Sequence, residues 1–215
     1  MKKAVIFDLD GTLLNSLIDI AESVNYVLRK YNLPQHKFDD YKYMIGNGVE
    51  VLVKKALPDN ISKEDFEKYY KEISEVYREN QMNKTHPYDG IKDMLQGLKD
   101  KGVKINILSN KPDNFTQEVV KHYFPEFEFA VIRGALPDVP KKPAPDAVYS
   151  IVEQNGIDKQ DFLYVGDTST DMQTAKNAGL TAVGVLWGYR NEQELKENGA
   201  DYIISKPEEL LGLIY

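Results

Sequence analysis

Two aspartates, Asp8 and Asp10, directly follow a short apolar run, Ala4 to Phe7, near the start of the chain. Such a run is typical of a buried strand, and side chains two positions apart on an extended chain lie on the same side. Gly11 then allows the chain to turn away from the strand. Carboxylates at the carboxyl end of a strand in an open α/β sheet lie where such sheets bind ligands. The spacing therefore predicts a ligand site that begins with these two aspartates.

Two other interpretations of this segment fit less well. Asp-Gly is a common turn dipeptide, so the pair could belong to an ordinary turn. An EF-hand would take Thr12 as its third ligand and Asp19 at its twelfth position, where a bidentate glutamate is needed. The apolar run before the pair favours a site at a strand end.

A second pair of acids follows another expected strand, Phe162 to Gly166. Asp167 comes directly after this strand, and Asp171 comes four residues later. Taken alone, Asp171 fits equally well as the negative charge of a helix N-terminus. Mg²⁺ prefers oxygen ligands and commonly takes one or two carboxylates together with water and phosphate oxygens. Carboxylates from two strand ends therefore predict a Mg²⁺ site that includes Asp8 and Asp167.

Residues suited to a phosphate group occur in two further places. Ser109 and Asn110 end an expected strand where a helix begins, and free backbone N–H groups at a helix start bind anions. A plain N-cap is the alternative for Ser109. Lys142 precedes Pro143, which favours an extended lysine just before a helix, where the ammonium could neutralise charge on a phosphoryl group. A lysine that only aids solubility is the alternative there.

Short β-branched runs alternate with helical patterns over most of the chain. The expected strands are Ala4 to Asp8, Val103 to Ser109, Phe129 to Ile132, Phe162 to Gly166, Thr181 to Val185 and Tyr202 to Ile204. The expected helices are Gly90 to Lys101, Pro112 to Tyr123, Ala144 to Asn155, Ser169 to Ala178, Glu192 to Asn198 and Pro207 to Leu213. This alternation predicts an α/β fold with a doubly wound, Rossmann-like parallel sheet.

The interval from residue 15 to residue 87 contains no convincing strand and is helical in pattern. Ser16 with Asp19, and Ser62 with Asp65, have the spacing of capping boxes that open helices. The interval therefore predicts an inserted unit built only of helices.

We expect two domains. A core domain comprises residues 1–14 and 88–215, and an α-helical cap domain comprises residues 15–87. The hinges are expected at Leu14 to Ser16 and at His86 to Asp89.

The composition is that of a soluble globular protein. With 27 lysines plus arginines against 34 aspartates plus glutamates, the formal net charge of the 215 residues is −7. A net acidic surface disfavours a nucleic-acid polymer as partner, whereas a small phosphorylated ligand needs only local positive charge. The absence of cysteine excludes disulfides, thiolate nucleophiles and cysteine-ligated metals. With neither a signal peptide nor a membrane span in the sequence, we expect a cytoplasmic monomer or homodimer without a membrane partner.

Four motifs follow successive strands in a fixed order. They are Asp8-x-Asp10-Gly11-Thr12, Ser109-Asn110, Lys142-Pro143 and Gly166-Asp167-x-x-x-Asp171. Together they resemble the haloacid dehalogenase superfamily of phosphotransferases, and the resemblance covers the whole chain. It implies an α/β core, a helical cap inserted between the first two motifs, and a Mg²⁺-dependent phosphatase.

Within this superfamily the chain is similar to the phosphoglycolate phosphatases. The segments that carry this similarity are Ile45 to Leu52, Leu108 to Pro112 and Lys141 to Pro143. The superfamily uses the first of these positions as a substrate-specificity loop, which implies that Gly46, Asn47 and Gly48 contact the substrate. An ordinary helix–helix turn explains the two glycines equally well.

Two positions depart from that subgroup, and they affect the choice of substrate more than the chemistry. Arg133-Gly134-Ala135 stands where a Gly-Gly-Asp stretch is common, and Asn15 stands where an acid is frequent. The segment from Trp187 to Arg190 either rims the site or forms a surface loop, and we favour the surface loop.

The resemblance also implies a role for each acid. Asp8 attacks phosphorus and forms an aspartyl-phosphate. Asp10 protonates the leaving group and then activates the water that hydrolyses the intermediate. Mg²⁺ is held by the carboxylates of Asp8 and Asp167 and by the backbone carbonyl of Asp10. Asp171 supports the site by orienting Lys142 or a water on the metal.

The remaining motif residues are implied to bind the phosphate. They are Thr12, Ser109, the Asn110 backbone and the catalytic Lys142. Gly11 supports them by turning the chain.

The expected function is hydrolysis of 2-phosphoglycolate or a similar small phosphorylated acid. Alternatives in the same fold are a pyrophosphatase, a 5′-nucleotidase, a sugar-phosphate phosphatase and a phosphomutase. A receiver-type signalling domain also gathers acids, a hydroxyl and a lysine around Mg²⁺, but Asp10 argues against it because an acid/base beside the nucleophile serves turnover. A binding module without activity is disfavoured because every expected polar group is present.

Overall fold

The apolar runs of the sequence form a six-stranded sheet in the order β5-β4-β1-β6-β7-β8. The computed structural model describes residues 1–214. The strands are β1 (Ala4–Phe7), β4 (Lys104–Pro112), β5 (Val131–Ala135), β6 (Phe162–Gly166), β7 (Thr181–Val185) and β8 (Tyr202–Ile204). Each strand runs parallel to its neighbours. The doubly wound parallel sheet is therefore confirmed.

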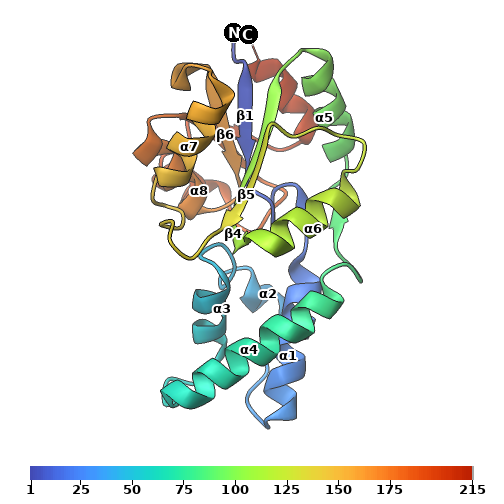
Figure 1. Ribbon diagram of the computed structural model, residues 1–215, viewed down its shortest axis with the longest axis vertical. Coiled ribbons are helices and arrows are strands. Elements are labelled where there is room, and N and C mark those ends of the chain that lie inside the picture. The colour runs from blue at the N-terminus through green and yellow to red at the C-terminus, as the bar shows by residue number, and fades with distance from the viewer. Residues whose placement is uncertain (215) are drawn as a thin grey trace.

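The side chains of β1 explain why helices cover both faces of this sheet. Val5 and Phe7 pack into an apolar cluster on one face, and Ala4 and Ile6 pack into a second cluster on the other. The first cluster includes side chains of α5 and α6, and the second includes side chains of α7 and α8. These two pairs of helices lie on opposite sides of the sheet (Figure 1). The core helices are α5 (Ile91–Asp100), α6 (Asp113–Tyr123), α7 (Asp146–Asn155), α8 (Ser169–Ala178) and α9 (Glu192–Glu197), with short 3-10 helices at Lys159–Asp161 and Pro207–Leu213.

The strand order places a topological switch point at β1. The chain forms β4 and β5 on one side of β1 and then crosses to form β6 on the other side. Phe7 lies opposite Ile107 of β4 and Val165 of β6, so the carboxyl ends of the three strands are aligned. Open α/β sheets bind ligands at this kind of position.

Four helices form a separate lobe beyond this edge of the sheet (Figure 1). They are α1 (Leu17–Lys30), α2 (Phe38–Tyr41), α3 (Val49–Ala56) and α4 (Lys63–Asn80), and we call them the cap helices. Their buried side chains form a third apolar cluster, which Phe115 and Tyr189 of the core join. Ser62 caps α4 as predicted, because its hydroxyl accepts a hydrogen bond from the backbone N–H of Asp65.

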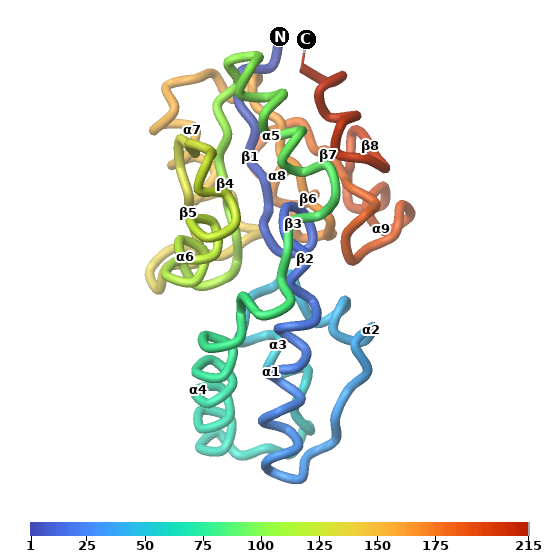
Figure 2. Tube along the Cα trace, turned by 90° about the vertical axis from the view of Figure 1, so that its right-hand side faces the viewer, coloured from blue at the N-terminus to red at the C-terminus, as the bar shows by residue number. Residues whose placement is uncertain are grey.

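The two connections between the lobes lie side by side. Leu14–Asn15 (β2) pairs with His86–Pro87 (β3) as a short antiparallel ribbon at the junction (Figure 2). The expected hinge segments therefore meet, although strands of two residues were not predicted. The division of the chain into a core domain and a cap domain of residues 15–87 stays a prediction.

The predicted capping box of Ser16 and Asp19 is wrong. Ser16 precedes α1 but makes no side-chain capping bond, because its hydroxyl donates to Asp10 instead. The buried Asp19 carboxylate accepts hydrogen bonds from the backbone N–H groups of Lys84 and Thr85 and from the Thr85 hydroxyl. Asp19 thus ties the returning chain to α1.

Three strands differ from their predicted bounds. β1 ends at Phe7 rather than at Asp8. β5 begins at Val131 rather than at Phe129, whose ring packs against Phe124 with 6.1 Å between centroids. β4 continues beyond Ser109 to Pro112, which pairs with the end of β5. Within residues 1–214, no helix is both long and apolar enough to cross a membrane.

Candidate active site

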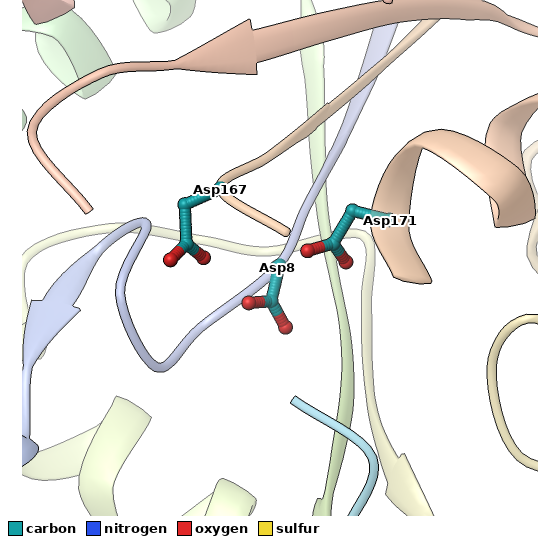
Figure 3. Close-up of side chains that lie close together, drawn as sticks. All are labelled: Asp8, Asp167 and Asp171. Atoms are coloured by element: carbon teal, nitrogen blue, oxygen red, sulfur yellow. The ribbon is translucent and has the colours of Figure 1, made fainter. Parts of the chain in front are cut away.

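Three buried carboxylates converge at the switch point. Asp8 follows β1, Asp167 follows β6, and Asp171 lies in the first turn of α8. One carboxylate oxygen from each lies within 4.8 Å of the others (Figure 3). The side chain of Asp10 is not part of this cluster. Asp10 was predicted to bind the metal through its backbone carbonyl.

Asp167 is held in place from two directions. The Thr12 hydroxyl donates to Asp167 Oδ1 at 3.0 Å, and the Tyr189 backbone N–H donates to Oδ2 at 2.8 Å. Gly11, with φ of 96°, lies so close that an added Cβ would be 2.3 Å from Asp167 Oδ2. Gly11 therefore makes room for the carboxylate as well as turning the chain. The Thr12 hydroxyl, predicted to bind phosphate, is engaged by Asp167 in this structure.

Lys142 bridges two of the three carboxylates. Its ammonium lies 2.7 Å from Asp8 Oδ1 and 2.7 Å from Asp171 Oδ1. The Asn110 side chain fixes the lysine backbone, because its Oδ1 accepts from the Lys142 N–H and its Nδ2 donates to the Lys142 carbonyl. The other Asp171 oxygen accepts from the backbone N–H and hydroxyl of Thr168, which caps α8. Asp171 thus both opens a helix and orients Lys142.

The electrostatics of this cluster favour a bound cation. Burial raises the pKa of Asp8 well above its usual value, and the charge of Asp171 adds to the effect. Burial, followed by the charge of Asp171, raises the pKa of Asp167 to about 7. Burial disfavours the charged form of Lys142, but the negative charges of Asp171 and Asp8 outweigh the effect of burial and raise the pKa of the lysine. One ammonium among three buried carboxylates leaves an excess of negative charge, and an all-oxygen donor set fits Mg²⁺.

Asp10 lies outside the cluster and lines the space between the strand ends and the cap helices. Its Oδ1 accepts from the Ser16 hydroxyl at 2.6 Å and from the Lys111 ammonium at 2.8 Å. The buried Lys111 also donates to the hydroxyl of Tyr77 on α4 at 2.6 Å. Lys111 was not predicted to be a site residue. Its position two residues after Ser109 could have revealed it, because alternate residues of an extended chain point to the same side, and Ser109 and Lys111 line the same cavity.

The prediction that Trp187 to Arg190 form a surface loop is wrong. The Trp187 indole N–H donates to the Thr12 carbonyl at 2.9 Å, and the buried Tyr189 binds Asp167 through its backbone. The Arg190 guanidinium donates to the carbonyls of Lys42 and Ile45 beside the cap helices. This loop therefore connects the acidic cluster to the cap. A single tryptophan and a single arginine after a strand form no motif from which this connection could be predicted.

The Gly46 to Gly48 loop joins the cap helices α2 and α3 and contacts the core. Asn110 Nδ2 donates to the Gly46 carbonyl at 2.9 Å, and the Thr170 hydroxyl donates to Asn47 Oδ1 at 3.0 Å. Both glycines have positive φ angles, 119° and 89°, which a side chain would strain. The loop is a helix–helix turn that lies at the site, and its contact with substrate stays a prediction.

A cavity of about 60 Å³ lies between the cap helices and the strand ends. Its floor includes Asp8, Asp10, Ser109 and Lys111. Apolar side chains of the cap region form the opposite wall, namely Ile20, Val24, Ile45, Val49, Leu52 and Ile73. Asp8 thus belongs to the acidic cluster and also lines a space that can hold a small molecule.

Proteins that are similar to this chain over its whole length are named as phosphatases. Residues 5–185 match the family described as haloacid dehalogenase-like hydrolase. The chain is 33% identical over 221 residues to a phosphoglycolate phosphatase of Mannheimia succiniciproducens, covering 99% of this chain and 98% of that protein. It is also 33% identical over 212 residues to a phosphoglycolate phosphatase of Aquifex aeolicus, covering 99% and 96%. A crystal structure of a predicted phosphoglycolate phosphatase from Haemophilus somnus superposes with a TM-score of 0.89 at 29% identity, covering 100% and 98%.

Proposed function

The chain belongs to the haloacid dehalogenase-like hydrolases, and from this membership we propose that it is a Mg²⁺-dependent phosphatase of a small phosphorylated acid. The substrate we propose first is 2-phosphoglycolate, because full-length relatives bear the name phosphoglycolate phosphatase. The observation that carries the proposal is the place of Asp8, which belongs to the acidic cluster and also faces the cavity.

We assign the first step to Asp8. Its carboxylate oxygen attacks phosphorus, a new O–P bond forms, and the bond from phosphorus to the leaving oxygen breaks. Asp10 faces the same cavity and supplies the proton that the leaving alkoxide takes up. Lys142, 2.7 Å from Asp8, compensates negative charge as the phosphoryl group transfers.

The second step reverses the role of Asp10. Its carboxylate takes a proton from a water molecule, which attacks phosphorus and releases Asp8 and phosphate. We assign the Ser109 hydroxyl to the phosphoryl oxygens, because Ser109 lines the cavity. Its oxygen accepts a hydrogen bond from the backbone N–H of Lys111, which leaves the hydroxyl proton for the phosphoryl group. The Asn110 side chain is occupied by the Gly46 and Lys142 carbonyls, so we assign substrate contact to its backbone.

The acidic cluster supplies the ligands for the metal. Asp8 and Asp167 would hold Mg²⁺, and we keep the Asp10 backbone carbonyl as the third protein ligand. The ion, when bound, would shield the nucleophile from the negative charge of the phosphate. Asp171 serves mainly to orient Lys142, to which it lies at 2.7 Å.

The cavity restricts the leaving group. With the cap helices as observed, about 60 Å³ accommodates roughly four water-sized groups. Glycolate has this scale, whereas a nucleoside would require the cap helices to move away from the core. The small space between the cap helices and the strand ends therefore favours a short phosphorylated acid over a nucleotide.

The test is release of phosphate from a panel of esters with Mg²⁺ or with a chelator. The panel contains 2-phosphoglycolate, a sugar phosphate, a nucleotide and pyrophosphate. We expect Mg²⁺-dependent release that is fastest from 2-phosphoglycolate. An absence of Mg²⁺-dependent release from every compound would sink the proposed function, and a preference for another compound would replace the substrate.

A further inference from the structure

The cavity offers few charged groups to a leaving group. Among the described residues that line it, the charged side chains are Asp8, Asp10 and Lys111. The cap helices contribute apolar side chains together with Ser74 and Tyr77. An anionic leaving group enclosed here meets a positive charge at Lys111.

Lys111 has a donor to spare. An ammonium carries three N–H groups, and hydrogen bonds to Asp10 and Tyr77 use two of them. The Tyr77 hydroxyl accepts one of these bonds, and within residues 1–214 no acceptor receives its own proton. Burial raises the pKa of Tyr77 to about 12, so this proton is present at neutral pH. Two donors, one from β4 and one from α4, thus remain available beside the cavity.

An ammonium shared by two carboxylates already occurs in this site. Lys142 lies at 2.7 Å from both Asp8 and Asp171. Lys111 has Asp10 as its one carboxylate partner within the described residues, so the same geometry has a place for a second carboxylate. A carboxylate buried against apolar side chains without such a partner is strongly unfavourable.

We propose that Lys111 and Tyr77 bind the carboxylate of the leaving group and so determine the specificity for phosphorylated acids. This inference rests on the proposed phosphatase function. Tyr77 belongs to a cap helix and Lys111 to the core, so both donors meet the substrate only when the cap helices pack as observed. Recognition of the acid is thereby coupled to enclosure of the substrate.

The experiment compares two substrates that differ only at the proposed contact. Ethyl phosphate has a methyl group where 2-phosphoglycolate has its carboxylate. For each protein the readout is the ratio of kcat/KM for 2-phosphoglycolate to kcat/KM for ethyl phosphate. Any effect of a substitution on Asp10 acts on both substrates, whereas loss of carboxylate binding lowers the ratio.

The variants are Lys111→Met, Lys111→Arg and Tyr77→Phe, with Tyr70→Phe on the same helix as the matched control. We expect Lys111→Met to lower the ratio by about 30-fold or more, as for loss of a buried charged partner. Lys111→Arg should keep much of the preference, and Tyr77→Phe should lower the ratio by about 10-fold. Tyr70→Phe should leave the ratio at the wild-type value, because the Tyr70 ring stacks on Phe66 away from the cavity lining.

Each failure points to a different error. A wild-type ratio in Tyr77→Phe, which keeps the ion pair of Lys111 with Asp10, overturns the role of Tyr77 even if Lys111→Met does not fold. Equal losses on both substrates in Lys111→Met would show that Lys111 serves Asp10 alone. A wild-type protein that hydrolyses neither ester but hydrolyses another compound of the panel would overturn this assignment and leave the phosphatase function standing. A wild-type protein that is inactive on the whole panel would overturn both.

Discussion

The floor and the wall of the cavity are built by different forces. The floor, in which we include here the adjoining acidic cluster and Lys142, comes largely from the ends of β1, β4 and β6. It holds buried charges in direct hydrogen bonds, such as that between Lys142 and Asp8 at 2.7 Å. The wall comes from the cap helices and consists of packed apolar side chains such as Val24 and Leu52. Charged contacts depend steeply on the position of single atoms, whereas apolar walls select by volume. The floor thus determines the reaction, and the wall, together with Lys111 of the floor, determines the substrate.

The largest expected effect is on the floor. In Asp8→Asn the amide replaces the attacking carboxylate, so kcat should fall by at least about 10⁴-fold. The measurement is Mg²⁺-dependent phosphate release under substrate saturation. Asp138→Asn, at an exposed acid, is the control and should retain wild-type kcat. Substantial turnover by Asp8→Asn would reject Asp8 as the nucleophile.

Asp10→Asn tests the proposed general acid and base, the carboxylate of Asp10, which lines the cavity beside Asp8. We expect kcat to fall by about 10²- to 10⁴-fold, because general acid and base assistance is lost while the nucleophile remains. Phosphorylated protein should accumulate in this variant, detected by mass spectrometry after an acid quench. Phosphorylation that is absent from Asp10→Asn but present in the wild type would place Asp10 earlier in the reaction than we propose.

The floor was largely predictable from the sequence. An apolar run comes directly before each of Asp8, Ser109 and Asp167. A parallel sheet must bring the carboxyl ends of such strands to one edge. Each signal is local in the chain, so no long-range contact had to be guessed. The fold class followed from the same alternation of strands and helices.

The contacts between floor and wall were not predictable in this way. Lys111 forms a hydrogen bond with Tyr77, which is 34 positions away in the sequence. Arg190 forms one with Ile45, which is 145 positions away. Asp19 has the spacing of a helix cap, yet a returning segment supplies stronger donors in Lys84 and Thr85. Tertiary hydrogen bonds outcompete local preferences at such positions, and the sequence pattern carries no trace of the partner.

A cavity-enlarging substitution tests the wall by itself. Leu52→Ala removes a buried side chain that lines the cavity, so bulkier esters should gain relative to 2-phosphoglycolate by about 10-fold in kcat/KM. The comparison substrate is p-nitrophenyl phosphate. The free energy of unfolding should fall by about 2–5 kcal/mol, as is usual for such truncations. Val53→Ala, a buried neighbour on α3 that does not line the cavity, should keep the wild-type preference. An unchanged preference in Leu52→Ala would mean that the wall does not select the substrate.

The smallest expected effect is on the Tm of the protein. The increase in Tm caused by Mg²⁺ should depend on pH through the floor and not through the wall. The pKa of Asp167 is about 7 in the folded protein against 3.8 for an unperturbed aspartate, so without metal its contribution to stability is lost as pH rises from about 4 through 7. Mg²⁺ binds the ionised carboxylates and offsets that loss. The increase in Tm caused by Mg²⁺ should therefore be small at pH 5 and about 5–10 °C at pH 8, measured by scanning calorimetry. Asp167→Asn should abolish this increase and stabilise the metal-free protein at pH 8, whereas Leu52→Ala should keep the increase from a lower Tm. A Mg²⁺ effect that is equal at both pH values would mean that the buried carboxylates of the floor are not what the ion binds.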